Sequence, residues 1–343
     1  MLCSIRIAST ATALRARWVG HHLILLVAIL FATLTGPVRA QPIWPSERPI
    51  HLIVPFPAGS SPDLLARALA TPLANKLGQS IVVENKPGAG GNIGTRFVAR
   101  APADGYTLLY TINGPLVTAP TLYKKTLGYD PVNDLAPITL VATSPNVLIV
   151  HAGFSGNTVA DFVKQAAQQS GRWNYGSVGP GSASHLAMEL FKKQAAIDLT
   201  HIPYNGFPQV TTAVIAQDIQ AAFMVPAIAM AQVKSGKVKA LGITSKTPIA
   251  SLPGIAPLAD QGFAQFEAIS WNAVLAPAGT PAAILARLNA ELVALLNSDD
   301  IRDKFALQYF SAVGSSPAAL KQLIQDEQRR WDAVIETLKL SLD

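Results

Sequence analysis

The stretch that decides the fold is residues 54–63, which read VPFPAGSSPD. It follows an apolar run at residues 50–54 and precedes a helical pattern that begins at Leu64. Glycine permits left-handed backbone and proline suits the first turn of a helix, so this composition predicts a bend leading directly into a helix. A short apolar strand, a bend and a helix in immediate succession are typical of α/β proteins.

The same alternation of strand and helix continues along the chain. We expect strands at residues 50–54, 80–84, 106–110, 146–150, 173–175, 199–202, 221–224 and 239–244. We expect helices at residues 64–77, 159–169, 184–194, 208–216, 281–297 and 317–340. The pattern predicts an α/β fold with mostly parallel sheets. Pro72 lies inside the first helix, so a kink or break is expected there.

Two further segments repeat the strand, glycine loop and helix of the opening stretch, at residues 81–94 and 173–185. Each places unpaired backbone N–H groups at a helix start, where the helix dipole favours an anion. In parallel sheets such loops lie at the carboxyl ends of the strands, where ligands bind. The three loops predict a cleft that holds an anion from two sides, with Phe56, Tyr204 and Phe207 as walls.

An ordinary structural reading of these loops remains open. Ser60 or Ser61 would then cap the helix that follows, with Pro62 in its first turn. Asp63 would offset the helix dipole as an acid near the helix start.

Residues 1–40 are predicted to be a secretory signal peptide. Arg6, Arg15 and Arg17 precede an apolar stretch at residues 23–34 that is short for a membrane span. Residues 38–40 (VRA) resemble a cleavage site, so we expect cleavage after Ala40 and a periplasmic location. An uncleaved anchor is the alternative.

The mature chain would have a nearly balanced charge. Loss of residues 1–40 leaves 23 basic against 21 acidic residues, a net charge of +2 in place of +6. Nucleic acid is therefore not an expected partner. Cys3 is the only cysteine and leaves with the signal peptide, so we expect no disulfide and no cysteine nucleophile. A mature length of 303 residues predicts two domains of about 150 residues each.

Motifs for common enzyme classes fail. The loop at Gly88 has Ile93 where a dinucleotide fingerprint needs its third glycine, and there is no P-loop. The four histidines after residue 40 form no close metal-ligand pair, so we expect neither metal nor cofactor. Ser182 and His185, three residues apart, are an esterase-like candidate for nucleophile and base. Otherwise Ser182 offers its hydroxyl to a ligand and His185 packs or orients it.

Taken together, these segments resemble the Bug family of periplasmic solute receptors, the TctC-type binding proteins of tripartite tricarboxylate transporters. The resemblance is carried by residues 48–59, 63, 83–94, 103–109, 129–138, 175–177, 181–182, 185–186, 202–204 and 276–281. It implies two doubly wound α/β domains joined by a two-crossover hinge, as in type II-like periplasmic binding proteins. Domain 1 would comprise residues 41–140 and 265–343, and domain 2 residues 141–264.

The resemblance also implies a function without catalysis. A monomeric receptor would capture a di-, tri- or aromatic carboxylate, or an amino acid, between its domains and deliver it to membrane permease subunits. A ligand sensor for a membrane kinase is the alternative. Carried over by position, the ligand-binding residues are Phe56, Pro57, Ala58, Gly59, Ser60, Asp63, Ala89, Gly90, Ser177, Ser182, His185, Tyr204 and Val225.

Two departures from the family pattern bear on specificity. A basic residue and several glycines commonly follow the Pro-Tyr pair, where this chain has residues 205–208 (NGFP). An acid often follows the strand that here ends in residues 223–226 (FMVP), so Val225 stands near the place of that acid. Its absence favours an apolar or aromatic carboxylate over an amino acid.

Overall fold

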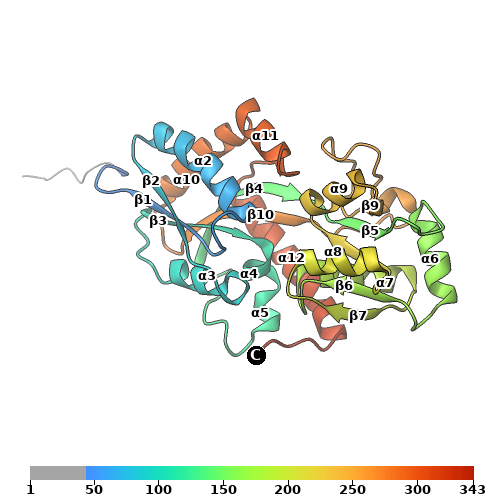
Figure 1. Cartoon of the computed structure of the whole chain (residues 1–343). Coiled ribbons are helices and arrows are strands. Elements are labelled where there is room, and N and C mark those ends of the chain that lie inside the picture. The colour runs from blue at the N-terminus through green and yellow to red at the C-terminus, as the bar shows by residue number, and fades with distance from the viewer. Residues whose placement is uncertain (1–43) are drawn as a thin grey trace, which may run out of the picture. The chain divides into compact units, whose positions relative to one another are not determined.

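The computed structural model describes residues 44–343, and the predicted signal peptide with its cleavage site lies outside the described residues. Trp44–Asp343 form one compact unit. This unit contains two sheets, each covered by helices, which we call lobe 1 and lobe 2 (Figure 1). No helix within residues 44–343 is both long enough and apolar enough to cross a membrane.

Lobe 1 is built on a six-stranded sheet in the order β11-β4-β10-β3-β1-β2. Its strands are β1 (Ile50–Val54), β2 (Ile81–Asn85), β3 (Thr107–Ile112), β4 (Leu135–Ser144), β10 (Ser270–Pro277) and β11 (Ser311–Ala312). Its helices are α2 (Ser61–Leu77), α3 (Asn92–Ala99), α4 (Asn113–Val117), α5 (Ala119–Leu122), α10 (Ala282–Leu296) and α11 (Asp299–Ala306), with the 3₁₀ turn η1 (Ala89–Gly91) before α3.

Lobe 2 is built on a five-stranded sheet in the order β7-β6-β8-β5-β9. Its strands are β5 (Val147–His151), β6 (Asn174–Ser177), β7 (Thr200–Pro203), β8 (Ala221–Met224) and β9 (Val238–Ile243). Its helices are α6 (Val159–Gln168), α7 (Ala183–Ala195), α8 (Phe207–Ala216) and α9 (Pro226–Lys234), followed by the 3₁₀ turn η2 (Leu258–Gln261). All eight strands expected from the sequence are present in the two lobes.

The expectation of mostly parallel sheets is wrong, because both sheets are mixed. β1 pairs in parallel with β2 and β3, and β6 pairs in parallel with β7 and β8. Every antiparallel pairing involves β4, β5 or β10. These strands adjoin the passages between the lobes, so each lobe keeps a parallel three-stranded unit beside strands that run the other way.

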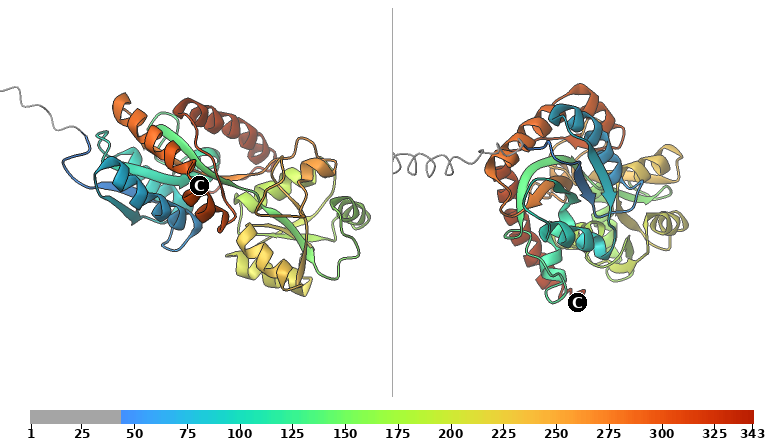
Figure 2. Two further views of the ribbon diagram at one scale, coloured as in Figure 1. Left: turned by 90° about the horizontal axis from the view of Figure 1, so that it is seen from above. Right: turned by 90° about the vertical axis from the view of Figure 1, so that its left-hand side faces the viewer.

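The chain passes between the lobes twice. β4 ends at Ser144 and β5 begins at Val147, so only two residues separate a strand of one sheet from a strand of the other. The return passage lies between β9 and β10. Helix α12 (Pro317–Thr337) then packs on β4, α4 and α5 of lobe 1 and on α7 of lobe 2 (Figures 1 and 2). The predicted domain boundaries near residues 140 and 264 stay a prediction.

The predicted break at Pro72 does not occur, and α2 is one continuous helix from Ser61 to Leu77. Proline removes one backbone hydrogen bond and crowds the preceding turn, which disfavours a helix interior. Leu65, Leu69, Leu73 and Leu77 are buried along one side of α2 and belong to the core of lobe 1. Burial of this stripe on both sides of Pro72 keeps the two halves in one helix.

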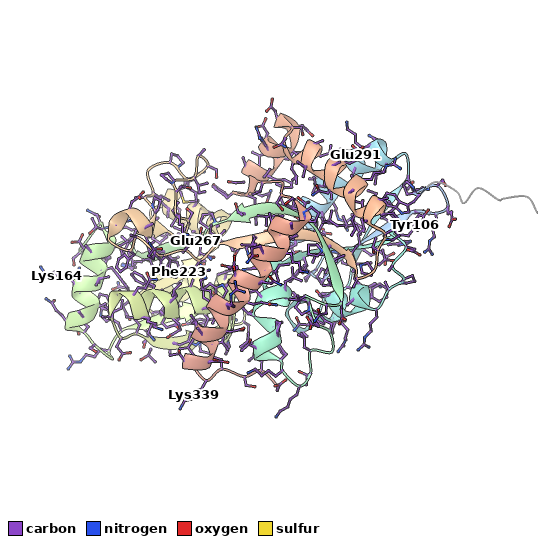
Figure 3. All side chains as sticks on the ribbon, turned by 180° about the vertical axis from the view of Figure 1, so that it is seen from behind. Tyr106, Lys164, Phe223, Glu267, Glu291 and Lys339 are labelled. Atoms are coloured by element: carbon purple, nitrogen blue, oxygen red, sulfur yellow. The ribbon has the colours of Figure 1, made fainter. Side chains whose placement is uncertain are left out.

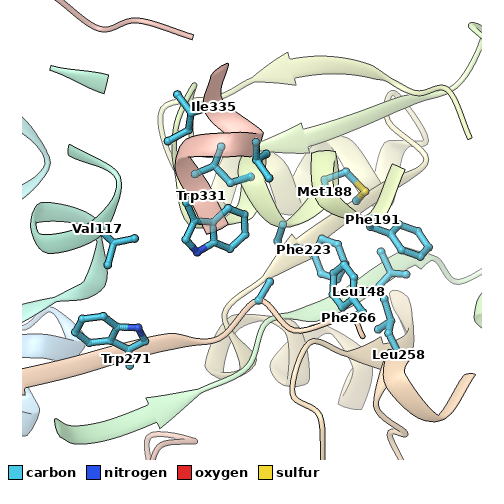
Figure 4. Close-up of a cluster of buried hydrophobic side chains, with 14 of the residues drawn as sticks. Val117, Leu148, Met188, Phe191, Phe223, Leu258, Phe266, Trp271, Trp331 and Ile335 are labelled. Carbon is cyan, nitrogen blue, oxygen red and sulfur yellow. The ribbon is translucent and has the colours of Figure 1, made fainter. Parts of the chain in front are cut away.

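An apolar cluster connects the two lobes beneath α12. It includes Val117 and Trp271 from lobe 1, Phe223 and Phe266 from lobe 2, and Trp331 on α12 (Figure 4). Burying a large apolar side chain contributes about 1.5–3 kcal/mol. The lobes and α12 therefore share a core rather than only a flexible connection.

Candidate ligand-binding site

A cavity of about 440 Å³ lies between the lobes. Residues that follow each of the six parallel strands line this cavity, so the carboxyl ends of these strands are directed towards it. Phe56 follows β1, Gly90 follows β2 and Asn113 follows β3. The residues from lobe 2 are Val178, which follows β6, Phe207, which follows β7, and Val225, which follows β8. The carboxyl ends of parallel strands are where α/β proteins bind ligands.

The loop before α7 presents backbone donors to this cavity. Ser182 is the N-cap of α7, and its hydroxyl accepts a hydrogen bond from the His185 N–H (3.3 Å). Ala183 and Ser184 are the first two residues of the helix, so their N–H groups have no partner within it. Both residues line the cavity. The arrangement is suited to an anion, since the positive end of a helix dipole adds to the two free donors.

His185 holds this loop in position and does not itself line the cavity. Its side chain is 4% exposed, and its Nδ1 accepts a hydrogen bond from the Gly181 N–H (3.0 Å). The ring stacks on His201 at a centroid distance of 4.0 Å. Burial, and then the neighbouring His201, lower the pKa of His185 to about 4. The ring is therefore neutral at pH 7, as an acceptor nitrogen requires.

The hydroxyls of Ser182 and Ser177 both make hydrogen bonds that hold the loop before α7. The Ser182 hydroxyl donates to the Gly179 carbonyl (2.7 Å). His185 Nδ1 accepts its hydrogen bond from the Gly181 N–H and not from Ser182. Ser177 is fully buried, and its hydroxyl bonds His201 Nε2 (2.7 Å) and the backbone of Gly179 (3.1 Å). These side chains fix the course of the loop.

Asp63 has the same kind of role in lobe 1. It is 2% exposed and accepts hydrogen bonds from the Gly59 N–H (2.8 Å), Asn85 Nδ2 (2.9 Å) and Arg67 Nε (3.0 Å). Burial alone would raise its pKa, but the hydrogen bonds from Arg67, Gly59 and Asn85 outweigh burial and hold the pKa below its usual value. The carboxylate is committed to the loop after β1, so no ligand amine or bridging water is needed to satisfy it.

The loop after β2 is strained at Ala89, next to Gly90, which lines the cavity. Ala89, Gly90 and Gly91 have positive φ angles of 48°, 65° and 99°. A non-glycine residue rarely adopts this conformation, and such strain tends to be kept at functional sites. Gly91 has no room for a side chain, because an added Cβ would lie 2.8 Å from the ring of Phe56. The loop therefore packs directly on the apolar wall that Phe56 provides.

The cavity lining carries no formally charged side chain. Within the described part of the chain, no Asp, Glu, Lys, Arg or His lines it. Its polar groups are backbone amides, hydroxyls such as Ser182 and Ser270, and the amides of Asn92, Asn113 and Asn146. No group of three His, Cys, Asp or Glu residues among residues 44–343 is placed to hold a metal ion.

The structure divides the residues expected at the site into two groups. Phe56, Gly90, Ser182 and Val225 line the cavity, as does Phe207, one of the expected walls. The others lie in the supporting loops or beside them and are not part of the lining: Pro57, Ala58, Gly59, Ser60, Asp63, Ala89, Ser177, His185 and Tyr204. Ser60 is the N-cap residue of α2, but its hydroxyl donates to the Pro57 carbonyl (2.6 Å) instead of capping the helix.

Sequence reasoning missed part of the lining. Ser184 lines the cavity and lies two residues beyond Ser182, within the glycine-loop segment at residues 173–185. Its place at the start of the expected helix could therefore have identified it as a binding residue. Leu122, Trp331 and Leu342 also line the cavity. Trp331 and Leu342 come from the end of the chain and reach the cavity only through the packing of α12, which no local pattern reveals.

A family model described as "Tripartite tricarboxylate transporter family receptor" matches residues 65–340. The chain belongs to this family. Protein BugT of Bordetella pertussis is 34% identical over 320 residues, which cover 92% of this receptor and 96% of BugT. Members of the family are periplasmic binding proteins with two α/β domains, the fold that this receptor has.

Two solved relatives carry ligands. An R. palustris protein solved with adipate is 32% identical, with a TM-score of 0.75, and the match covers 87% of this receptor and 99% of that protein. MatC from Rhodopseudomonas palustris, solved with bound malate, is 29% identical, with a TM-score of 0.69, and the match covers 84% and 99%.

Proposed function

We propose that this receptor binds a small organic carboxylate in the cavity between its lobes and delivers it to membrane permease subunits. The observation that carries the proposal is that Ala183 and Ser184, whose N–H groups have no partner within α7, line the cavity. The relatives solved with adipate and malate support the same ligand class. We further propose that the receptor is exported to the periplasm, acts as a monomer and catalyses no reaction.

The uncharged lining supports a narrower ligand class. A carboxylate is satisfied by N–H and O–H donors alone, whereas an ammonium group needs acceptors and is best paired with an acid. Asp63 is the acid in the first turn of α2, and its oxygens already accept hydrogen bonds from Gly59, Asn85 and Arg67. The ligand we propose is therefore a carboxylate with an apolar body rather than an amino acid.

Backbone donors supply enough free energy only in combination. A helix terminus contributes about 0.3–2 kcal/mol to a nearby anion, and a hydrogen bond to a charged group about 1.5–3 kcal/mol. Micromolar affinity needs about 8 kcal/mol. Two or three charge-assisted hydrogen bonds, a dipole and contact with Phe56, Phe207 and Trp331 together reach this value, so the apolar walls are required as well as the donors.

Titration calorimetry with adipate, benzoate and aspartate tests the proposal. Adipate or benzoate is expected to bind with a micromolar Kd, and aspartate at least about 30-fold more weakly, since burying an unpaired charge costs more than 2 kcal/mol. Benzamide, which has the shape of benzoate without its charge, is the control and should not bind measurably. Failure of every carboxylate to bind would refute the receptor proposal, and tightest binding of aspartate would refute the narrower ligand class.

A further inference from the structure

The segment after α12, residues 338–343, runs back to lobe 1. The Leu342 N–H donates to the Leu122 carbonyl at the end of α5 (2.7 Å). The Asp343 carboxylate accepts from the N–H groups of Lys125 (2.9 Å) and Thr126 (3.2 Å) and from the Thr126 hydroxyl (3.1 Å). Four hydrogen bonds therefore tie these two residues to lobe 1.

The side chain of Leu342 meets lobe 2 instead. Leu342 lines the cavity and is only half-buried. A Cβ added to Gly181, in the glycine loop before α7, would lie 3.4 Å from Leu342 Cδ1. A leucine anchored to lobe 1 by its backbone thus lies beside Gly181, in the loop of lobe 2 that precedes α7, and both residues line the cavity.

The start of this segment is built to turn the chain away from the helix. Lys339, which marks this end of the chain in Figure 3, has a φ of 53°. The Leu340 N–H then donates to the Ile335 carbonyl (3.2 Å) on the last turn of α12. Leu338, Leu340 and Leu342 pack on the shared apolar cluster. The segment therefore has a defined path along the shared apolar cluster, and Leu342 reaches the cavity.

We propose that residues 338–343 form a strap that completes the ligand cavity, with Leu342 as a specificity-determining wall. The proposal rests on the proposed function, because it concerns the same cavity. With the strap in place, an apolar side chain replaces water beside the ligand. Ligand release requires Leu342 and the loop at Gly181 to move apart, so the strap slows dissociation and limits how large the ligand body can be.

Binding of adipate and benzoate to strap variants tests the proposal. In Leu342→Ala, and in a chain ending at Lys339, the Kd of the better-binding probe should rise about 5- to 30-fold, mainly through a faster dissociation rate. Asp343→Ala should show a smaller change in the same direction, since it removes the anchor and keeps Leu342. Leu307→Ala is the matched control, because it removes the same atoms from a leucine that is 78% exposed.

Hydrogen exchange of the ligand-free protein gives a second readout that needs no probe. The amides of Lys125 and Thr126 should exchange faster in Asp343→Ala, and the Gly181 amide should exchange faster in Leu342→Ala. Unchanged exchange in these variants would overturn the strap, as would wild-type Kd and dissociation rate in Leu342→Ala. If wild-type protein binds neither probe but the exchange rates respond, the proposed function fails and the strap stands.

Discussion

Replacing Gly181 by alanine should raise the Kd for a bound carboxylate by about tenfold or more. The added Cβ would lie 2.7 Å from Cδ1 of Leu122, a residue of lobe 1. To relieve the clash, either the Leu122 side chain turns into the cavity that it lines, where it takes space from the ligand, or the loop before α7 shifts. A shift of this loop displaces the N–H donors of Ala183 and Ser184, and about 1.4 kcal/mol of lost binding is already a tenfold effect.

Two variants separate this clash from backbone strain. Gly181 has a φ of 74°, so any side chain there also costs about 1–2 kcal/mol in the left-handed region. Gly179→Ala introduces left-handed strain in the same loop, at a φ of 114°, but its Cβ meets no atom within 4 Å. It should weaken binding less than Gly181→Ala. Leu122→Ala combined with Gly181→Ala should recover part of the affinity, and equal losses in all three proteins would show that the contact between lobes is unimportant.

The ligand-free protein should lose stability as the pH falls from about 6.5 towards 4. The pKa of His185 is about 4 in the folded protein against an ordinary value of 6.5, so the unfolded chain binds the proton more tightly. The free energy of unfolding is therefore highest above pH 6.5 and declines as the pH drops through this window, by up to about 3 kcal/mol. Burial also lowers the pKa of His201, which acts in the same direction.

Unfolding in denaturant at pH 7 and pH 4.5 measures this effect. His185→Asn keeps an acceptor oxygen near the position of Nδ1 and removes the titrating group, so its stability should fall less between the two pH values. His151→Asn is the matched control, since His151 Nδ1 likewise accepts a backbone N–H, from Gly153, but through an exposed hydrogen bond at the end of β5. Asp63 adds to this decline only at lower pH, because its pKa is lowered from 3.8 and the stability that its carboxylate provides is lost only when it is protonated. An identical decline in wild type and His185→Asn would contradict the assignment.

The framework of the site could be predicted from the sequence because it depends on local chemistry. The glycine and proline residues of the loop after β1 predict a bend whatever the rest of the fold is. The spacing of the residues that follow predicts the start of a helix directly behind it. The same holds for the loop after β6, which contains Ser182. Each of these loops follows a parallel strand, so each was expected at the edge of its own sheet where the carboxyl ends of the parallel strands lie.

The roles of the polar side chains could not be predicted in the same way. Asp63, Ser177 and His185 are the residue types that bind ligands, but here they hold the backbone of the binding loops. Spacing cannot tell whether a side chain turns towards the cavity or back to its own loop, because both arrangements place it within reach. Trp331 and Leu342 depend on α12 crossing both lobes, a contact between segments far apart in the sequence.

A crystal structure of the receptor with benzoate tests the central claim most directly. The carboxylate oxygens should lie within about 3 Å of the N–H groups of Ala183 and Ser184, with the ring against Phe56, Phe207 and Trp331. A carboxylate bound instead by an arginine or lysine side chain, or one bound outside the space between the lobes, would contradict the claim.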